Sequence, residues 1–587
     1  MEDTTTPAHL SLSRKEWIDP EPIQGAATVR TLSNDLDISE TLAEILALRG
    51  IADVDAAHRF LHPDEAQLHP PQLMLGMHEA VQRIMRAVDD YEKILVIGDY
   101  DVDGTAGAVI LFSYLKRLGA RVGYYIPQRL SDGYGFTPSI LRRIVEWKTG
   151  LVITADFGST EVEAPGLLKP HGIDLIITDH HQLGPTAPDA AALVNPHQPN
   201  CPYPFKDLSA AGVSFKVVCA LDDHLEKIDF WNRRGICHTA PSYFLDMVAL
   251  ATVADMSPLR GENRVLVKLG LDQLNGKPRP GMSGLVKECR LRGPITPRAI
   301  TLKLAPKINA LGRVGDPRMG VQLLLSHSFT EGRRLARQLM DVNRARQVIE
   351  REVYAMAREQ MDSLPDLPAI ILVGDNWHQG VIGSIATRLA YQEGRPTIVL
   401  THPSGDELSG SARGMDRYDV LSMLEDCQML LERFGGHRNA AGLSLFAHNL
   451  PEFSTRFQSA VEKDGMGLDP DQERRRLRIE AWIGQEDLTP QLVDEMNRLS
   501  PFGQGNPEPV VGVRGFRPGN PAVINNRHLK FHLPCGTGQK LEAFAWDHSD
   551  WELEGSGTYD MAFTPQTAPN HNGGHAQLSV LDLKNTG

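Results

Sequence analysis

The sequence predicts an α/β protein with three parts: a parallel-sheet domain, a smaller α/β domain joined to it by a long helix, and a C-terminal β-barrel. Three short apolar runs, at Ile94–Ile97, Leu151–Ile153 and Leu175–Ile177, have the length and the β-branched residues of buried strands. Helical patterns separate these runs, and strands that alternate with helices form parallel sheets. Acidic residues follow each run. Because the carboxyl ends of parallel strands meet at one edge of a sheet, we expect these acids to converge there.

The acids and two neighbouring histidines predict a two-metal phosphohydrolase site. Carboxylates that converge at one edge repel one another unless cations neutralise them. Oxygen and imidazole ligands suit Mn²⁺ or Mg²⁺ better than metals that prefer thiolates. A single Asp at a strand end is more often a helix cap, and the alternate acids at 99–103 also fit a calcium loop, but a strand precedes them and no glutamate closes an EF-hand. The candidate residues are Asp99, Asp101, Asp103, Asp156, Asp179, His180, His181 and Asp255.

These motifs resemble the DHH phosphoesterase superfamily, and specifically its bacterial single-strand DNA exonucleases. The Asp179-His180-His181 triplet carries the resemblance, with Gly-Asp-Tyr-Asp-Val-Asp-Gly before it and Val248–Asp255 after it. The resemblance covers nearly the whole chain. The other matching segments, in the family's order, are Leu48–Ile51, Phe60–Pro63, Asn309–Arg313, Trp377–Gly383 and Gly435–His437.

One motif departs from the family pattern. Asp156-Phe157-Gly158 stands where the family has Asp-Asn-Gly, so the metal ligand is kept and its polar neighbour is lost. The aromatic ring either packs beneath the site or faces the substrate channel as a platform for a base or sugar. We expect packing, because strand ends beneath metal sites are crowded.

The resemblance implies a 5′-to-3′ exonuclease that hydrolyses single-stranded DNA to mononucleotides in DNA repair and recombination. Two Mn²⁺ or Mg²⁺ ions in such a site activate a water and stabilise the leaving oxygen. His181 is expected to serve as a transition-state donor or proton shuttle, Asp179 to orient a histidine, and Asp156 to take part directly. The expected metal ligands are Asp99, Asp101, Asp103, Asp156, His180 and Asp255.

The resemblance also assigns residues to the DNA. Arg129, Ser411 and Arg413 are expected at the 5′ phosphate, because a dianionic terminal phosphate favours paired guanidiniums more than an internal diester does. Glycine-rich turns let backbone N–H groups approach phosphate. The residues expected near other phosphates are Asn309, Arg313, Gly435, Gly436 and His437.

Patterns of apolar residues and prolines divide the chain into parts. In the predicted long helix, Leu335, Leu339 and Val342 begin a series with three- and four-residue spacing, which fits either a plain core helix or a bridge between domains. Its place between two motif-bearing halves favours the bridge. The predicted parts are an N-terminal helical segment at 1–90, the DHH catalytic domain at 91–325, the connecting helix at 326–365, the DHH-associated phosphate-binding domain at 366–462, and an OB-fold nucleic-acid-binding domain at 470–587.

The C-terminal part has the strand pattern of an OB-type barrel, a fold that often binds single strands through aromatic stacking and basic grooves. Its candidate contacts are Arg527, His528, Lys530, Phe531 and Trp546. The expected strands lie near 477–483, 510–516, 523–533, 540–546, 558–564 and 577–582, around one helix at 489–499.

Composition fits a globular cytoplasmic protein. The chain has 587 residues, of which 41% are hydrophobic and 23% charged, and its formal net charge is −14. This charge argues against a uniformly basic DNA-binding coat, although a local basic stripe is enough to hold phosphates. Six scattered cysteines indicate free thiols, and no apolar run is long enough to span a membrane. The expected partners are single-stranded DNA with a 5′ end, a helicase and a single-strand binding protein, with the chain itself a monomer.

Two other functions fit part of the sequence. A DHH phosphodiesterase for dinucleotides or short oligonucleotides would share the acids, but such a substrate needs neither the barrel nor the N-terminal segment. A non-catalytic single-strand-binding scaffold would keep the fold without metals. Retention of every acid argues against the scaffold, whereas Phe157 keeps it open.

Overall fold

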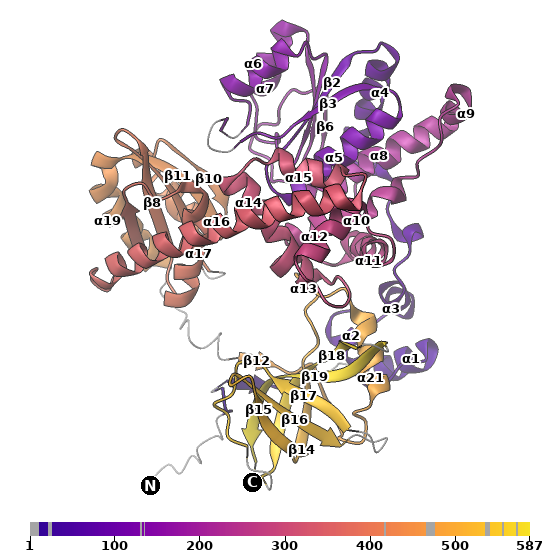
Figure 1. Ribbon diagram of the computed structural model, residues 1–587, viewed down its shortest axis with the longest axis vertical. Coiled ribbons are helices and arrows are strands. Elements are labelled where there is room, and N and C mark those ends of the chain that lie inside the picture. Colours follow the sequence, from indigo (N-terminus) through magenta and orange to yellow (C-terminus); the bar gives the residue numbers. More distant parts are fainter. Residues whose placement is uncertain are drawn as a thin grey trace.

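The computed structural model describes residues 11–13, 15–21, 26–128, 132–133, 135–415, 418–464, 476–534, 540–553, 557–570 and 573–586. Arg129 lies outside the described residues. The described chain forms an upper α/β domain, a smaller α/β domain beside it and a β-barrel below, and the long helix α16 joins the first two (Figure 1). This arrangement confirms the predicted fold class.

The first sheet is parallel throughout, with strand order β3-β2-β4-β5-β6. Along β2, Ile94 and Val96 pack against helices α4, α5 and α8, whereas Leu95 and Ile97 pack against α6 and α7. Helices therefore cover both faces, as parallel sheets require. The bounds are β2 Lys93–Gly98, β3 Arg121–Tyr125, β4 Leu151–Ala155, β5 Asp174–Thr178, β6 Ala192–Val194, α4 Met77–Asp89, α5 Val102–Arg117, α6 Pro138–Glu146, α7 Ala164–Leu168 and α8 Ala210–Lys227.

Helix α16 (Phe329–Asp362) confirms the predicted bridge between domains. Its 34 residues span about 50 Å at 1.5 Å per residue. Leu335 and Leu339 pack into the core of the first domain, and Val353 and Ala357 pack into the core of the second. The helices before it are α9 Phe230–Arg234, α10 Leu245–Ala254, α11 Gly261–Gly276, α12 Pro280–Glu288, α13 Pro297–Ala299, the π-helix η5 Ile300–Leu304, α14 Ala305–Val314 and α15 Arg318–Leu325.

The second sheet has the order β10-β11-β9-β8-β7, in which only the β7–β8 pair is parallel. Helix α17 packs on β8 and β9 and carries the Trp377–Gly383 motif at its start. The bounds are β7 Ile370–Gly374, α17 Gln379–Glu393, β8 Thr397–Ser404, β9 Glu407–Arg413, α18 Val420–Glu425, β10 Arg433–His437, β11 Ala440–Phe446 and α19 Leu450–Asp464.

The barrel is a seven-stranded sheet with the order β13-β14-β18-β19-β17-β16-β15. The structure differs from the sequence-based expectation at 523–533, which is a hairpin and not one strand. Asn525 and Asn526 both have positive φ, of 54° and 53°, as a tight hairpin turn requires. The bounds are β13 Ala481–Ile483, α21 Pro490–Met496, β14 Val511–Phe516, β15 Gly519–Ile524, β16 His528–Pro534, β17 Lys540–Ala545, β18 Tyr559–Asn570 and β19 Gly573–Asn585.

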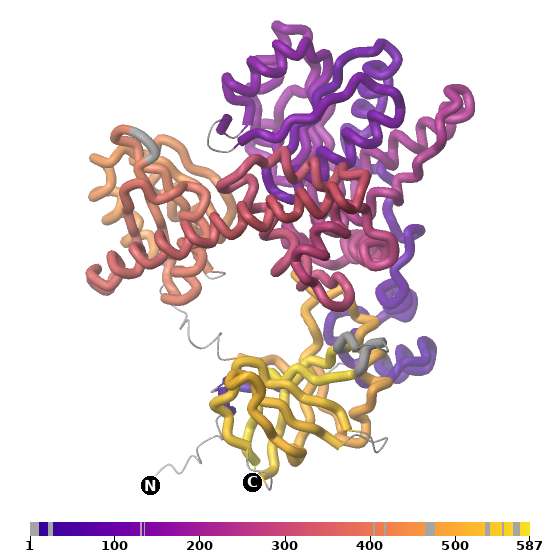
Figure 2. Tube along the Cα trace, in the orientation of Figure 1, coloured from indigo at the N-terminus to yellow at the C-terminus, as the bar shows by residue number. Residues whose placement is uncertain are grey.

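The N-terminal helices α1 (Ala26–Leu36), α2 (Glu40–Leu48) and α3 (Val54–Leu61) share a hydrophobic core with the barrel, and the two segments lie side by side (Figure 2). The structure differs from the all-helical expectation at β1 (Glu16–Ile18), which pairs in parallel with β12 (Arg476–Arg478). A strand pair formed by such distant residues leaves no local signal in the sequence.

Within the described part of the chain, no helix is both long and apolar enough to cross a membrane. The five cysteines described there are free thiols.

Candidate active site

The loop after β2 carries three of the candidate acids. Asp101 caps helix α5 by accepting a hydrogen bond from the backbone N–H of Gly104 at 3.0 Å. A Cβ at Gly104 would lie 2.4 Å from the backbone nitrogen of Asp99, so the tight turn requires glycine there. Asn309 of α14 accepts a hydrogen bond from the N–H of Val102 at 3.0 Å. The structure therefore places Asn309 under the acidic loop, where it holds the loop in position.

Asp103 is buried, and its carboxylate faces the start of helix α8. Its two oxygens accept hydrogen bonds from the N–H groups of Ala210 and Ala211 at 2.7 and 2.8 Å. A helix N-terminus favours a negative charge. Burial, together with the charges of Asp255 and Asp101, nevertheless raises the pKa of Asp103 well above its ordinary value. Helix α8 fixes the direction of the carboxylate without neutralising it.

Asp156 follows β4 in a left-handed backbone conformation, with φ 73°. It is 3% exposed, and its Oδ1 has no hydrogen-bond partner among the described residues. Burial and then the charges of Asp101, Asp103 and Asp99 raise the pKa of Asp156. His180 Nε2 lies 3.2 Å from this Oδ1. A buried carboxylate oxygen that accepts no hydrogen bond and lies beside a histidine and other acids fits a site for a cation.

The structure brings all six predicted ligands together. Their ligand atoms form three overlapping groups, and within each group the atoms lie within 4.8 Å of one another. The donors are carboxylate oxygens and imidazole nitrogens, which fit Mn²⁺ or Mg²⁺. The groups are Asp99, Asp101 and Asp156; Asp103, His180 and Asp255; and Asp156, His180 and His181.

Asp179 orients His181. One carboxylate oxygen, Oδ1, lies 2.8 Å from His181 Nδ1 and accepts the N–H of His180, while Oδ2 accepts the N–H of Ser159. Burial alone would raise the pKa of Asp179, but the hydrogen bond and charge of His181 hold it well below its ordinary value. Burial likewise works to lower the pKa of His181, but Asp179 and nearby acids outweigh it and raise that pKa to about 9.

Phe157 packs beneath the site. It is 4% exposed and lies in the core between the first sheet and helices α6 and α7, with its ring 5.8 Å from the ring of Phe136. The expectation of packing is confirmed. A side chain this buried is not a platform for a base.

The second domain faces the acids with residues from β9 and β10. His437 stacks on His181, with ring centroids 5.8 Å apart and an interplanar angle of 10°. Ser411 and Arg413 lie on β9, and both approach Gly383 of α17: a Cβ there would lie 3.3 Å from Ser411 Oγ and 3.0 Å from Arg413 Nη2. Gly383 belongs to the Trp377–Gly383 motif, but the sequence alone indicates no role for it.

The remaining predicted substrate residues lie near the same edge. Gly435 and Gly436 are exposed on β10 and pair with Gly442 and Ala441 of β11. Arg313 lies near the end of α14, and its carbonyl oxygen would be 2.3 Å from a Cβ at Gly380, so α14 and the start of α17 are in close contact.

One candidate contact on the barrel needs correction. Phe531 is fully buried in the barrel core and is not available for stacking. Lys530 and Arg527 are paired with Glu542 and Asp547. Trp546 is 46% exposed and stacks on Phe544 with an interplanar angle of 10°.

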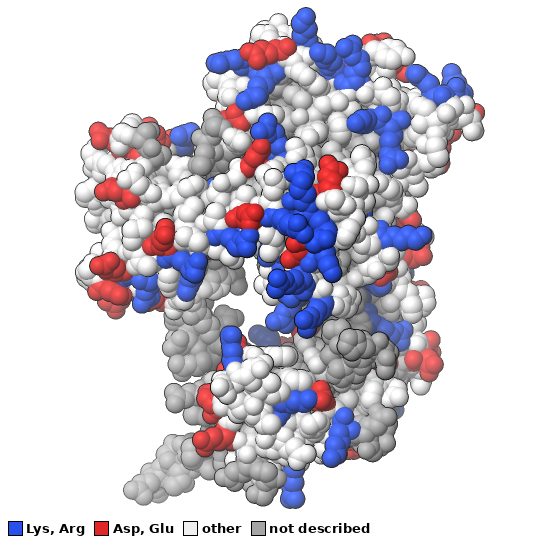
Figure 3. Space-filling model, in the orientation of Figure 1, with Lys and Arg blue, Asp and Glu red and all other residues white. Residues whose placement is uncertain are grey.

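Lysine and arginine side chains gather over the helices between the first sheet and the barrel, beside the opening above the barrel (Figure 3). A local basic region of this kind is enough to hold phosphates in a chain whose net charge is negative. The exposed basic residues in the segment from the end of α12 to η5 are Arg290, Arg292, Arg298 and Lys303.

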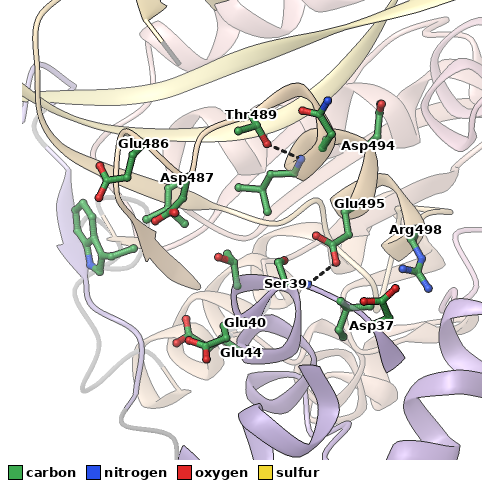
Figure 4. A pocket seen from close by; sticks show the side chains of 16 residues that line it. Asp37, Ser39, Glu40, Glu44, Glu486, Asp487, Thr489, Asp494, Glu495 and Arg498 are labelled. Carbon is green, nitrogen blue, oxygen red and sulfur yellow. Dashed lines mark hydrogen bonds between the residues drawn. The ribbon is translucent and has the colours of Figure 1, made fainter. Parts of the chain in front are cut away.

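One acidic cavity is separate from the catalytic site. It has a volume of about 1010 Å³ and lies between the N-terminal helices and the barrel, lined by acids (Figure 4). These acids repel phosphate. They include Asp37, Glu40, Glu44, Glu486, Asp487, Asp494 and Glu495.

Three family models match the chain. The DHH family N-terminal domain matches residues 93–252, the DHHA1 domain matches 366–463, and the RecJ OB domain matches 479–582. These three ranges lie in the parallel-sheet domain, the smaller α/β domain and the barrel, respectively.

Full-length relatives match as well. The single-stranded-DNA-specific exonuclease RecJ of Bacillus subtilis is 35% identical over 506 residues, 85% of this chain. This chain spans 62% of that relative, which is less than two thirds of its length. RecJ of Dickeya dadantii is 33% identical over 520 residues, which cover 86% of this chain and 89% of that protein.

Solved structures agree with these relatives. RecJ from Thermus thermophilus in complex with Mn²⁺ matches with a TM-score of 0.79 and 27% identity, covering 97% of this chain and 80% of that one. The same protein in complex with Mg²⁺ matches with a TM-score of 0.73 and 26% identity, covering 97% and 79%. This chain belongs to the RecJ family of single-stranded-DNA-specific exonucleases.

Proposed function

We propose that this chain is a metal-dependent exonuclease that degrades single-stranded DNA from the 5′ end and releases mononucleotides. The observation that carries the proposal is the buried Oδ1 of Asp156, which has no hydrogen-bond partner in the described part of the chain and lies among the other acids. The names of the relatives support single-stranded DNA as the substrate.

We assign the ligand role to the six clustered residues named from the sequence. When bound, divalent cations supply an activated water and charge stabilisation at the leaving oxygen. The rigid supports of Asp103 and Asp101, which are the backbone N–H groups of α8 and α5, keep the donor set in place before substrate arrives. Such preorganisation removes the cost of rearranging charged groups during the reaction.

His181 is placed to hold a proton close to the reacting phosphate. Its Nδ1 is fixed by Asp179 at 2.8 Å, which leaves Nε2 as the nitrogen that can face substrate. Burial works to lower the pKa of His181, but the hydrogen bond and charge of Asp179 raise it to about 9, which favours the protonated ring. We assign His181 the role of donor to the phosphate oxygens and Asp179 the role of a positioning residue.

The 5′ end is proposed to lie on β9. Ser411 is buried and Arg413 is partly buried, and Gly383 leaves space beside both side chains. A guanidinium in a confined space discriminates a dianionic terminal phosphate from a diester. Asn309 acts by supporting the metal loop, and we assign Arg313, Gly435, Gly436 and His437 to neighbouring phosphates. Arg129 stays a sequence-based assignment to the 5′ phosphate.

The experiment that tests this function is digestion of single strands labelled at either end, in Mn²⁺, Mg²⁺ or EDTA. The proposal predicts that label at the 5′ end is released first as a mononucleotide, only with a divalent cation, and that blunt duplex resists digestion. Preference for dinucleotides over long strands would instead indicate the small-molecule phosphodiesterase. Binding without cleavage under every condition would indicate the scaffold.

The wider setting is also a proposal. We propose that the protein works in the cytoplasm as a monomer, with a helicase that exposes single strands and a single-strand binding protein that delivers them. We keep the division at 1–90, 91–325, 326–365, 366–462 and 470–587 as its domain organisation, which the three family matches support. Size-exclusion chromatography with light scattering checks the monomer.

A further inference from the structure

A cavity of about 650 Å³ lies where the N-terminal helices, helix α11 and the barrel meet. This volume is within the usual range for ligand pockets. Its lining comes mainly from α3, from the start of α11 and from the barrel segment 505–507, and no acid of the metal centre is among the described residues that line it. In Figure 1, α3 lies on the side of the molecule away from the second domain, which faces the metal centre. The cavity is therefore separate from the catalytic site.

Arg264 of α11 brings a buried charge to this cavity. It is 2% exposed, and its guanidinium lies 3.7 Å from the centre of the Phe60 ring. Three of its N–H groups donate to the carbonyl oxygens of Phe60, Leu499 and Arg498, at 2.9, 2.8 and 3.1 Å. A guanidinium has five N–H groups. The other two have no partner among the described residues, and no carboxylate there neutralises the charge.

Of the other three arginines that line the cavity, two are already neutralised. Arg49 pairs with Glu480 at 2.8 Å. Arg260 pairs with Asp207 at 2.8 Å. Arg59 of α3 is exposed and makes no side-chain hydrogen bond or ion pair with the rest of the described chain. Arg59 therefore adds a second charge that the protein leaves without a counterion.

The acid that α11 contributes to the lining does not balance these charges. The carboxylate of Glu262 pairs with Lys216 at 2.7 Å and accepts the O–H of Tyr203 at 2.6 Å. Burial, and then the charge of Arg49, lower the pKa of Arg264 to about 9. An anion bound beside a guanidinium favours its charged form. The cavity thus has the charge and the free donors of an anion site.

The rest of the lining is largely apolar. Ile51, Phe60, Val265 and Pro507 come from the N-terminal helices, α11 and the barrel. Arginine binds phosphate through paired hydrogen bonds, and an apolar wall suits a nucleobase, which has an apolar face. Inorganic phosphate would use only the cations. A ligand with one phosphate and one base uses both kinds of wall.

We propose that this cavity is a second, non-catalytic site that binds a mononucleotide. The phosphate contacts Arg59 and Arg264, and the base packs against Ile51, Phe60 and Pro507. Because Arg264 also bonds to carbonyl oxygens of α3 and the barrel, a bound mononucleotide strengthens the joint between the first domain and the barrel. That this ligand is the product of the chain's own reaction rests on the proposed function, whereas the binding itself does not.

The test is calorimetric titration of the full chain with 5′-dAMP, after dialysis to remove divalent cations, since the catalytic acids then repel phosphate. The wild-type chain should bind dAMP at least about tenfold more tightly than deoxyadenosine or inorganic phosphate. Saturating dAMP should raise its unfolding temperature. Arg59→Ala should bind dAMP about tenfold more weakly, the loss of one charge-assisted hydrogen bond. This variant should stay folded, because Arg59 is exposed and unpaired in the described chain.

The matched control is Arg30→Ala, which removes an exposed arginine of α1 that does not line the cavity and should leave the affinity unchanged. Absence of dAMP binding, or equal affinity in the wild-type chain and Arg59→Ala, would overturn the inference. Equal affinity for inorganic phosphate and dAMP would overturn the nucleotide as its ligand. Digestion of single strands in Mn²⁺ separates the two proposals: digestion without dAMP binding makes only the second site wrong, and dAMP binding without digestion makes only the proposed function wrong.

Discussion

The edge of the first sheet and the surface of the barrel are both proposed to contact DNA, but they differ in how their charged residues are held. At the sheet edge, Asp103 and Asp156 are buried and held by the backbone, and burial among other acids raises the pKa of each. On the barrel, the side chains of Arg527 and Lys530 are 68% and 25% exposed, and each is paired with an acid of the same surface. The acids at the sheet edge are therefore fixed in position and need a cation to balance their charge. On the barrel, Asp547 and Glu542 already balance the charges of Arg527 and Lys530.

This difference sets the expected size of mutational effects. Removing a buried metal ligand should change the reaction rate strongly, because the charges in the site interact strongly with one another. Loss of one partner of an exposed ion pair usually changes the free energy by only about 0–1 kcal/mol. Substitutions at the sheet edge should therefore have much larger effects than substitutions on the barrel.

The largest effect is expected for Asp156→Asn. Asparagine tolerates the left-handed backbone at this position, whereas alanine would be strained there. The variant should stay folded, and its kcat on single-stranded DNA should fall by at least about a thousandfold, or about 4 kcal/mol in the barrier. Digestion kinetics with a thermal unfolding curve check both parts, and a near-normal rate would refute the ligand role.

Phe157→Asn separates stability from substrate binding. Replacing this buried ring should lower the free energy of unfolding by about 3–5 kcal/mol, the usual cost of truncating a core Phe. Affinity for single strands in Ca²⁺ should stay the same, because the ring does not reach the surface. Phe157→Leu, which keeps most of the apolar volume, should recover much of the stability. An unchanged unfolding temperature in the Asn variant would contradict the packing role.

Arg413→Ala tests recognition of the strand end. Its kcat/KM should fall about 10- to 100-fold on 5′-phosphorylated strands, the loss of one or two charge-assisted hydrogen bonds, and much less on 5′-hydroxyl strands. Arg433→Ala is the matched control, since Arg433 lies on β10 of the same sheet and its side chain is 81% exposed. Equal losses on both substrates would indicate that Arg413 contacts an internal phosphate and not the 5′ phosphate.

The smallest effect is expected on the barrel. Trp546→Ala should weaken single-strand binding by about 1–3 kcal/mol, the value of one base stack, without changing kcat. Val523→Ala removes another exposed apolar side chain of the barrel, 52% exposed, and should have no effect. A fluorescence anisotropy titration measures the affinity of the wild-type chain and of both variants for single strands. Equal affinity in all three would show that Trp546 does not contact the DNA.

The sequence predicted the sheet edge well because its signals are local. Each apolar run is followed directly by its acid, and a parallel sheet leaves one edge for all of them. A local signal also predicted α16: its apolar residues recur at three- and four-residue spacing. Family resemblance supplied the roles of Asp179, His180 and His181 and the candidate residues of β9 and β10.

The sequence predicted the barrel less well because side-chain direction there depends on where each strand turns. The hairpin at Asn525 and Asn526 breaks a run that was expected to be one strand, and it places Phe531 in the core. Contacts between distant segments were also invisible: Asn309 supports the acidic loop from α14, and Gly383 makes room beside Arg413. Such roles follow from packing, which no local pattern encodes.

The most direct test of the metal centre is the number of Mn²⁺ ions bound per chain, measured by titration with electron paramagnetic resonance detection of free Mn²⁺. The control is Asp222→Asn, at an acid in a separate cluster that is already bonded to Tyr114 and His238 at 2.7 and 2.9 Å. The account predicts two ions for the wild-type chain and for Asp222→Asn, and at most one tightly bound ion for Asp156→Asn. Equal numbers of ions in all three proteins would contradict the assignment of the sheet edge as the metal centre.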